Sequence, residues 1–482
     1  MLDMRPVGYV IGLLVMALGL AMLFPMLVDL AEGRDHWPVF AESSILTMLV
    51  GGLIALTCRN GVGTGLTIQQ TFLLTTGVWV VLPMFASMPL MLGASDLRFV
   101  DAFYESMSGL TTTGATVMTG LDTLPKGLLL WRGLIQWLGG VGVIVVAMVF
   151  LPELRVGGMQ LFKAEAFDTF GKILPRATEI AAGISVIYLA MTLMCVASYL
   201  LAGLNVFDAT VHALTTISTG GMANYDSSFN HLPDAAEYVA SVFMILAALP
   251  FVRFVQMAAG TARPLLYDPQ VRAFFGTVTV IILSLTLWRC FQIGELNEDT
   301  FREVLFNTIS IMTGTGFASE NYMLWGPLPV TVIFLVGLIG GCAGSTSCSI
   351  KIFRFQLLFA SIRVQMQRIR SPHGVFTPRY GGRAVDDDVM NSVMSFFVFF
   401  VVSLGLIAVL LSLTGLDFVT SVTGAASALA NIGPGLGDII GPAGNFATLN
   451  DTAKWILSAA MLVGRLEILA VYAIFTVNFW RT

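Results

Sequence analysis

Charged residues are scarce in this chain. Asp, Glu, Lys and Arg make up 11% of the 482 residues, whereas 56% are hydrophobic. A soluble protein carries about 25% charged residues, so this composition excludes a soluble globular protein and places most side chains against lipid or other apolar helices. A membrane-spanning helix needs roughly 20 apolar residues. Ten segments are therefore predicted as spans: 7–30, 40–58, 67–94, 127–151, 178–203, 236–260, 271–293, 327–350, 389–414 and 453–479.

Histidine and cysteine are also few, and their positions argue against two kinds of site. The four histidines lie far apart in sequence, which disfavours a metal centre or a membrane-embedded enzyme, so we expect no catalytic residues. The five cysteines lack the spacing of a disulfide framework. Only Cys342 and Cys348 lie close together, and a packing or loop role is favoured for that pair over metal or redox chemistry.

Lys and Arg are unevenly placed along the chain. If the chain starts inside and alternates sides, they concentrate in the inner loops, which places the amino terminus in the cytoplasm. Asp and Glu concentrate in the outer loops, where they either attract cations or simply keep these loops soluble. Two long inner loops, 152–177 and 364–388, are polar and basic on balance. Either could contact a cytoplasmic subunit, although the acids at 386–388 also suit the start of the next helix.

Four short segments between the spans end in a polar turn that contains glycine. None is long enough to cross a bilayer, and irregular backbone at membrane depth is tolerated only where protein buries it or it lines a wet cavity. Four such turns can converge on one axis and surround it with carbonyl oxygens, as in a potassium filter. The turns read Thr112-Thr113-Gly114-Ala115, Ser218-Thr219-Gly220-Gly221, Gly314-Thr315-Gly316-Phe317 and Asn431-Ile432-Gly433-Pro434.

Glycine suits these turns because it adopts positive φ and lets four backbones approach one axis. Thr or Ser precedes a glycine in the first three turns and offers a hydroxyl near the ion path, whereas the fourth turn is expected to contribute carbonyls alone. The predicted filter residues, with K+ as the ion they hold, are Thr112, Thr113, Gly114, Ser218, Thr219, Gly220, Gly314, Thr315, Gly316, Asn431, Ile432 and Gly433.

The segments before the turns are predicted to be short pore helices. They begin near Asp101, Asp208, Phe301 and Asp417, so that the negative ends of their dipoles point at the turns. The predicted fold is an all-α polytopic membrane protein with four helix–pore helix–helix repeats around a central pore and two extra amino-terminal helices. The expected divisions are 1–66 for the two extra helices, 67–151 for repeat 1, 152–260 for a cytoplasmic loop and repeat 2, 261–370 for repeat 3, and 371–482 for a cytoplasmic loop and repeat 4.

Small and hydroxyl residues interrupt the eighth span. Residues 337–349 contain four glycines and four serine or threonine residues, which disfavour a helix. A break near mid-membrane is therefore expected. Because this break follows the third turn, it would lie below the filter as a gate; a tightly packed crossing of small residues is the alternative. A phosphate-binding loop is excluded, since the Gly-x4-Gly-Lys-Ser/Thr spacing is absent. The predicted gate residues are Gly340, Gly341, Gly344, Ser345, Thr346, Ser347, Lys351 and Arg465.

Arg465 lies in the middle of the tenth span, two residues before Glu467. A charge at that depth costs on the order of 3 kcal/mol, so a functional role is the default. We expect Arg465 to point at the pore, engage carbonyls of the 340–349 loop and repel cations. The alternative is compensation by Glu467, although residues i and i+2 do not share a helix face. Arg253, near an inner boundary, is explained by snorkelling.

Together these residues resemble the membrane subunit of the Trk/Ktr/HKT superfamily of potassium transporters. The resemblance runs from about residue 67 to the end and rests on the four turns, on the segment 340–351 and on Gly464-Arg465-Leu466-Glu467. The two leading helices are similar to those of the bacterial Trk-type branch. The resemblance implies that residues 340–351 form an intramembrane gate loop with Arg465 beside it.

The resemblance also implies the surroundings of the chain. It implies a homodimer in the lipids of the bacterial inner membrane, with one pore per protomer. A cytoplasmic TrkA-like ring of nucleotide-binding regulatory subunits would dock on the inner face, so that nucleotide binds the partner rather than this chain. No nucleic acid is expected.

Gated potassium uptake is the favoured function, with two alternatives. Sodium-preferring members of the superfamily often carry serine where this chain has Gly114, which favours potassium. Gly314 stands where many relatives keep threonine, which leaves a weakly selective potassium and sodium pathway open. The other alternative is a symporter that couples potassium to protons or sodium. Proton coupling usually needs titratable residues within the spans, and besides Arg465 and Glu467 we expect almost none.

Overall fold

The computed structural model describes residues 3–61, 66–149, 177–295, 297–466 and 468–481. Within these ranges the chain is almost entirely helical, which confirms the predicted class. Two-residue strands, β1 (Arg379–Tyr380) and β2 (Arg383–Ala384), pair as one small antiparallel hairpin. Most of the inner loop 152–177, and also Glu467, lie outside the described residues.

Seven helical segments of the described chain are long and apolar enough to span a membrane. They are α1 with α2 (Arg5–Ala21, Leu23–Ala31), α3 (Trp37–Cys58), α4 with α5 (Ile68–Ala86, Met88–Leu92), α7 (Lys126–Val149), α10 (Ala177–Leu201), α15 (Pro269–Ile293) and α19 (Asp387–Leu413). These segments match seven of the ten expected spans.

The other three expected spans are not continuous helices. Span 236–260 divides into α12 (Asp234–Ala247) and α13 (Phe251–Ala258), which meet at 89°. Pro250 stands at this break, where it lacks an N–H to continue the helical hydrogen bonds. Span 453–479 divides into α22 (Asp451–Arg465) and α23 (Ile468–Ile474), which meet at 110°. Span 327–350 is helical only in α17 (Pro327–Gly337), as its small residues predicted.

Four shorter helices lie between the spans, as expected. They are α6 (Phe99–Leu110), α11 (Val206–Ile217), α16 (Glu298–Thr313) and α20 (Phe418–Ala430). The side chains of Asn205, Asn297 and Asp417 cap three of them by accepting a hydrogen bond from a backbone N–H three residues later. The remaining helices are the long α18 (Ile352–Arg370), the short α14 (Arg263–Leu266), α21 (Gly437–Ile440) and α24 (Val477–Arg481), and the 3₁₀ turns Arg59–Gly61, Leu121–Thr123, Ser228–His231 and Tyr322–Trp325.

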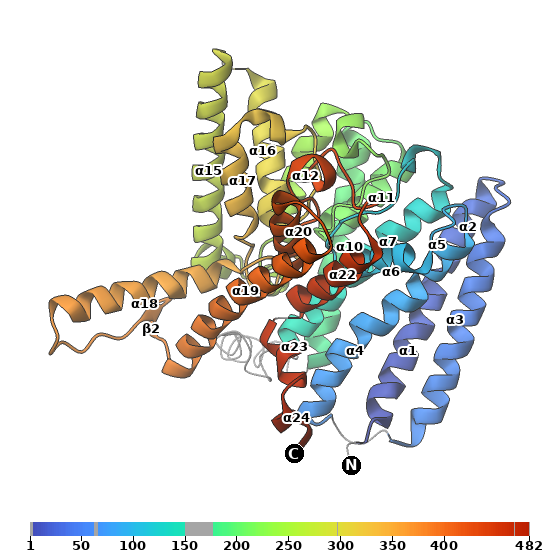
Figure 1. Cartoon of the computed structure of the whole chain (residues 1–482), viewed down its shortest axis with the longest axis horizontal. Coiled ribbons are helices and arrows are strands. Elements are labelled where there is room, and N and C mark those ends of the chain that lie inside the picture. Colours follow the sequence, from blue (N-terminus) through green and yellow to red (C-terminus); the bar gives the residue numbers. More distant parts are fainter. Residues whose placement is uncertain (1–2, 62–65, 150–176, 296, 467, 482) are drawn as a thin grey trace.

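The four repeats close into a ring. Helix α7 of the first repeat packs against α11 of the second, α12 packs against α16, α17 against α20, and α22 against α6 of the first repeat again. The four pore helices therefore face one common centre. Outside this ring, α1 packs against α3 and α4, and the α1–α3 pair forms one flank of the molecule (Figure 1).

The amino and carboxyl termini lie at the same end of the molecule (Figure 1). Helix α18 extends away from the bundle (Figure 1). It carries the exposed apolar side chains Phe359, Met366 and Ile369. At the break between α12 and α13, Arg253 Nε donates to Asp268 Oδ2 at 2.8 Å. Snorkelling was the expected explanation for Arg253, and the structure adds an ion pair with Asp268, the residue that caps α15.

Candidate ion filter and gate

Each pore helix ends in the same backbone conformation, although the sequences differ. A residue in the left-handed region ends each helix, and a glycine with positive φ follows two residues later. The first set is Thr112 (φ 52°), Thr219 (49°), Gly314 (74°) and Asn431 (50°), and the second set is Gly114 (82°), Gly221 (77°), Gly316 (82°) and Gly433 (107°). Glycine suits the second position because this region disfavours other residues.

This backbone pattern shifts the second turn by one residue from its predicted alignment. Gly221, not Gly220, occupies the position of Gly114, while Gly220 occupies that of Thr113. The hydroxyl expected before the glycine of the second turn is consequently absent. Two adjacent glycines made both alignments compatible with the sequence, and only the φ angles distinguish them.

A closed cycle of backbone contacts joins the four turns. At the second of the two positions in each turn, which is always a glycine, an added Cβ would clash with or crowd a carbonyl oxygen of the next turn. The four pairs are Gly114 with Gly220, Gly221 with Thr315, Gly316 with Ile432, and Gly433 with Thr113. Since the last pair returns to the first turn, the turns surround one axis.

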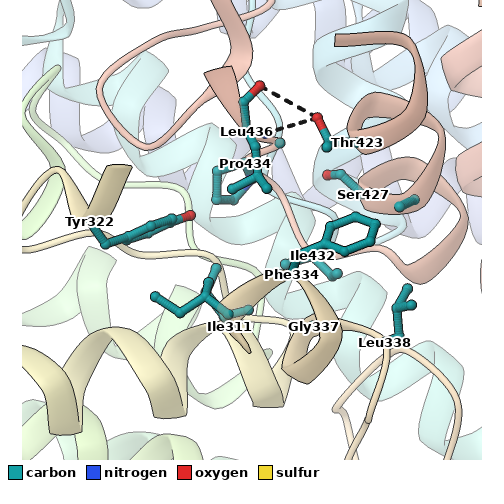
Figure 2. A pocket seen from close by; sticks show the side chains of 13 residues that line it. Ile311, Tyr322, Phe334, Gly337, Leu338, Thr423, Ser427, Ile432, Pro434 and Leu436 are labelled. Atoms are coloured by element: carbon teal, nitrogen blue, oxygen red, sulfur yellow. Dashed lines mark hydrogen bonds between the residues drawn. The ribbon is translucent and has the colours of Figure 1, made fainter. Parts of the chain in front are cut away.

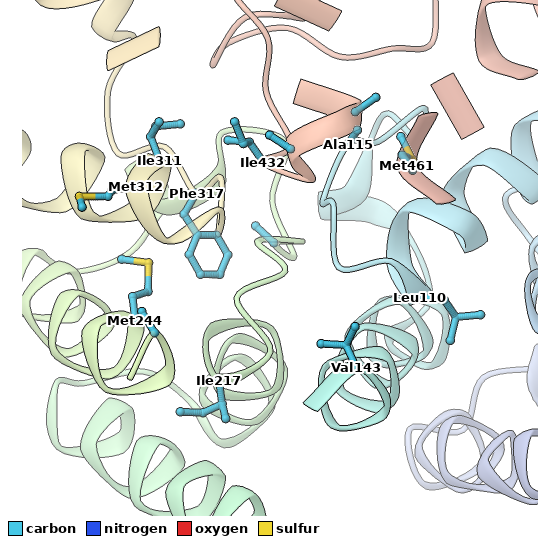
Figure 3. Packing of buried hydrophobic residues seen from close by; sticks show 14 of the residues in the cluster. Leu110, Ala115, Val143, Ile217, Met244, Ile311, Met312, Phe317, Ile432 and Met461 are labelled. Atoms are coloured by element: carbon cyan, nitrogen blue, oxygen red, sulfur yellow. The ribbon is translucent and has the colours of Figure 1, made fainter. Parts of the chain in front are cut away.

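Buried apolar side chains pack behind this ring and hold the ends of the pore helices. They come from all four repeats, so the turns rest on a continuous core. Leu110, Val143, Ile217, Met244, Ile311, Phe317, Ile432 and Met461 are among them (Figure 3).

Side chains fix the turns to one another and to their helices. Asn431 Nδ2 donates to Thr113 Oγ1 at 2.8 Å and to the Met461 carbonyl at 3.0 Å, which links the fourth turn to the first. Gln136 Nε2 of α7 donates to the Gly220 carbonyl at 2.6 Å, and Gln136 Oε1 accepts from the Met222 N–H at 3.1 Å. Gln136 thus supports the second turn from the first repeat, a role that the sequence alone did not indicate.

A buried ion pair holds the segment after the first turn. Arg132 Nε of α7 donates to Glu105 Oε1 of α6 at 2.9 Å, and both side chains are at most 2% exposed. Glu105 also accepts from the Val117 N–H at 2.9 Å and from Thr116 Oγ1 at 3.0 Å. Arg132 Nη1 donates to the Ala223 carbonyl at 2.9 Å, beyond the second turn. The pair therefore fastens the outer ends of two neighbouring turns.

In the other three repeats, a neutral or acidic side chain of the pore helix holds the segment that follows the turn. The donor–acceptor pairs are Asn224 Nδ2 to Asp208 (2.7 Å), Ser319 N–H to Asn307 (3.3 Å) and Leu436 N–H to Thr423 (3.0 Å). Figure 2 shows the Thr423–Leu436 bonds beside a small apolar cavity of about 30 Å³ that involves Ile311, Phe334 and Ile432. This cavity lies behind the fourth turn, between the third and fourth repeats.

The predicted gate residues other than Arg465 lie in one largely buried loop at residues 338–351. The Gly341 N–H donates to Ser347 Oγ at 2.9 Å, which closes the loop on itself. Several bonds attach it to the α12–α13 break. In two of them the Phe251 N–H donates to the Gly344 carbonyl at 3.0 Å, and Thr346 Oγ1 donates to the Ala247 carbonyl at 3.0 Å. Another attachment reaches the fourth pore helix, where the Ser349 N–H donates to the Ala430 carbonyl at 2.9 Å. Gly340 and Ser345 are buried in the same loop, and Lys351 Nζ donates back to the Ser347 carbonyl.

Arg465 reaches this loop from the end of α22. Its Nη1 lies 2.7 Å from Cys348 Sγ and 3.4 Å from the Thr346 carbonyl, and the residue is 7% exposed. The expected contact between Arg465 and a loop carbonyl is therefore present. The cysteine contact was missed, because the sequence favoured only a packing or loop role for Cys348.

The expectation that the spans hold few ionisable residues is wrong. Arg132 lies in α7, Glu237 in α12 and Lys454 in α22, and all three are buried. Each has a charged partner: Arg132 pairs with Glu105, Glu237 with Arg302 at 3.5 Å, and Lys454 with Asp101 at 2.6 Å. These ion pairs hold pore helices against the spanning helices around them.

The acids that the sequence predicts on the outer side, where they could attract cations, are partly engaged in ion pairs. Arg302 of α16 lies within 4 Å of Asp234, Glu237, Glu298 and Asp299. In the same helix, burial and then a hydrogen bond with Glu320 raise the pKa of Glu303 to about 7. Arg302 and the raised pKa of Glu303 therefore leave fewer of these carboxylates as free negative charges.

Glu303 should make the stability of the folded chain depend on pH. Between its ordinary pKa of 4.5 and about 7, folded Glu303 keeps a proton that the unfolded chain has released. Raising the pH through this window therefore lowers the free energy of unfolding. We expect the melting temperature in detergent to fall from pH 5 to pH 7, and to fall less in Glu303→Gln. An equal fall in both proteins would assign the pH dependence to other groups.

Both the sequence and the fold resemble those of known proteins. Residues 36–480 match the TrkH family, described as cation transport protein. The chain is 42% identical over 478 residues to the Trk system potassium uptake protein TrkI of Halomonas elongata, covering 99% of this chain and 97% of that protein. It is 34% identical over 490 residues to TrkH of Escherichia coli strain K12, covering 99% of each.

A solved structure agrees with the sequence matches. The crystal structure of the potassium transporter TrkH from Vibrio parahaemolyticus superposes on this chain with a TM-score of 0.91 at 31% identity, covering 100% of both chains. The fold, the family match and the relatives therefore agree over nearly the whole length. The chain belongs to the TrkH family of cation transport proteins.

Proposed function

We propose that this chain takes up potassium across the bacterial inner membrane through a gated filter of backbone carbonyls. The closed cycle of contacts among the four turns carries this proposal, because it sets carbonyls of Thr113, Gly220, Thr315 and Ile432 around one axis. Rings of carbonyl oxygens can replace the water shell of a potassium ion. The relatives named as potassium uptake proteins support the choice of ion.

The loop at 338–351 is the proposed gate. It lies against the end of the fourth pore helix and contacts Thr112 of the first turn, so it stands directly beneath the filter. Arg465 adds a buried positive charge there, which opposes the passage of a cation. Potassium would enter from the outer side, exchange water for carbonyls and pass when the loop moves.

The filter is tested by potassium and sodium flux in proteoliposomes. The parent chain is expected to pass potassium in preference to sodium. In Gly114→Ser the preference should fall, because the new side chain would press on the Gly220 carbonyl. Gly276→Ser in α15 is the matched control, since a Cβ there would have no described atom within 4 Å apart from the nearby backbone of its own helix. Unchanged selectivity in Gly114→Ser would contradict the filter assignment.

The gate is tested by Arg465→Ala. Replacing Arg465 by alanine removes its contacts with Cys348 and Thr346 and also removes its positive charge. Potassium flux should therefore rise several-fold. Arg354→Ala is the matched control, because Arg354 is equally buried but lies over the ring of Phe396, 3.8 Å from its centre. A rise in both variants, or a fall in Arg465→Ala alone, would count against a gating role for Arg465.

The assembly is proposed as a homodimer with a TrkA-like nucleotide-binding ring on the inner face and the amino terminus in the cytoplasm. The exposed apolar residues of α18 support a second copy, since they extend beyond the bundle. Crosslinking between introduced cysteines on α18 in membranes would test the dimer.

The alternative transport mechanism is a symporter. Flux that requires a pH gradient would favour it over the gated filter.

A further inference from the structure

Cys348 stands on the axis of the four turns. Its Sγ lies 3.7 Å from Thr112 Oγ1 of the first turn. On the other side, a Cβ added to Gly314 of the third turn would lie 3.1 Å from the Cys348 Cβ. Thr112 and Gly314 hold the same backbone position in the first and third repeats, which face each other across the ring. A side chain that reaches both must lie between them, immediately below the filter.

Arg465 approaches the same sulfur with hydrogen-bonding capacity left over. Its Nη1 contacts Cys348 Sγ, but its Nε and Nη2 have no hydrogen-bond partner among the described residues. The residue is only 7% exposed. Leaving buried charged donors unpaired is unfavourable. A hydrogen-bond acceptor placed beside the sulfur, within reach of Nε or Nη2, would therefore be stabilised by Arg465. An oxygen atom on that sulfur would supply one.

We propose that Cys348 is a thiol-oxidation site that closes the ion path when a hydroperoxide reaches it. This inference rests on the proposed function. The sulfur attacks one peroxide oxygen, so that an S–O bond forms while the O–O bond breaks. Sulfur is oxidised by two electrons, the peroxide is reduced to water or an alcohol, and the thiol proton goes to the departing oxygen. The product is a sulfenic acid, which thiols reduce again through a mixed disulfide.

The oxidised sulfur strengthens the closed arrangement in two ways. The added oxygen occupies space on the axis between Thr112 and Gly314. It also accepts hydrogen bonds from Arg465, which ties the loop from the third repeat to α22 of the fourth. Both effects hold the loop beneath the filter.

Cys342 provides an internal comparison within the same loop. It is buried at the α12–α13 break, where its N–H donates to the Ala248 carbonyl at 2.9 Å. Ser345 Oγ donates to the Cys342 carbonyl at 2.7 Å. Oxidation of Cys342 would therefore not place an oxygen beside Arg465.

The test measures potassium uptake by the purified chain in proteoliposomes before hydrogen peroxide, after it, and after dithiothreitol. Flux in the parent and in Cys342→Ser should fall about tenfold, the shift that a charge-assisted hydrogen bond gives a two-state equilibrium, and return with dithiothreitol. The ratio of treated to untreated flux should stay near one in Cys348→Ser. Arg465→Ala should gain the oxygen on Cys348, detected by mass spectrometry, with a smaller fall in flux.

Other results overturn the inference. An equal fall in Cys348→Ser, an oxidised Cys348 with unchanged flux, or a Cys348 that stays unmodified would each exclude it. Absence of potassium flux before peroxide is added would instead count against the proposed function. The two failures are therefore distinguishable in one experiment.

Discussion

Replacing Gly221 by alanine is expected to lower potassium flux roughly tenfold or more. A Cβ at this position would clash with the carbonyl oxygen of Thr315, and the backbone φ is 77°. Holding another residue in such a region costs about 1–3 kcal/mol, and the clash falls on a carbonyl of the proposed filter. Potassium and sodium uptake in proteoliposomes would measure the loss of flux and of selectivity together.

Gly220→Ala is the informative comparison for the same turn. A Cβ there would meet the side chain of Gln136, which can move, rather than backbone. We expect Gly220→Ala to keep more flux than Gly221→Ala, because only the Gln136 support is disturbed. Gly276→Ala should retain the parent flux. If Gly220→Ala were the more damaging change, the alignment that gives Gly221 the position equivalent to Gly114 would be wrong.

Composition and glycine placement predicted most of the architecture. Seven full spans, four short pore helices and the break after Gly337 are all present. These features depend on local physics, namely apolar length and the poor helix-forming tendency of glycine and serine. The bend at Pro250 could also have been anticipated, since proline interrupts the helical hydrogen bonds. The bend after Arg465 has no comparable local signal.

The contacts around the turns were less predictable, because they join residues far apart in sequence. Glu105 and Arg132 belong to different helices, and nothing local indicates that they pair. A comparison of the repeats offered one usable signal: Glu105 precedes Val117 by the same interval that separates Asn307 from Ser319. The position of Cys348 on the axis depends on how the loop folds back, which spacing alone does not determine.

Replacing Glu105 by alanine is expected to lower the free energy of unfolding by about 3–5 kcal/mol, the cost of breaking a buried ion pair. Arg132, which is 2% exposed, would keep its charge in the core without a carboxylate. The Val117 N–H would lose its acceptor as well. Denaturation in detergent would measure the loss of stability. Flux should also lose selectivity, because Thr116 and Val117 directly follow the first turn.

An exposed ion pair provides the matched control for this change. Lys126 Nζ lies 2.8 Å from Glu32 Oε1, but the two side chains are 44% and 40% exposed. Water replaces such a partner, so Glu32→Ala should change stability by at most about 1 kcal/mol. Glu105→Gln should fall between the two, since it keeps an acceptor for the Val117 N–H but removes the charge that faces Arg132. If Glu105→Ala lowered the free energy of unfolding no more than Glu32→Ala does, the buried pair would not be what holds the outer end of the first turn.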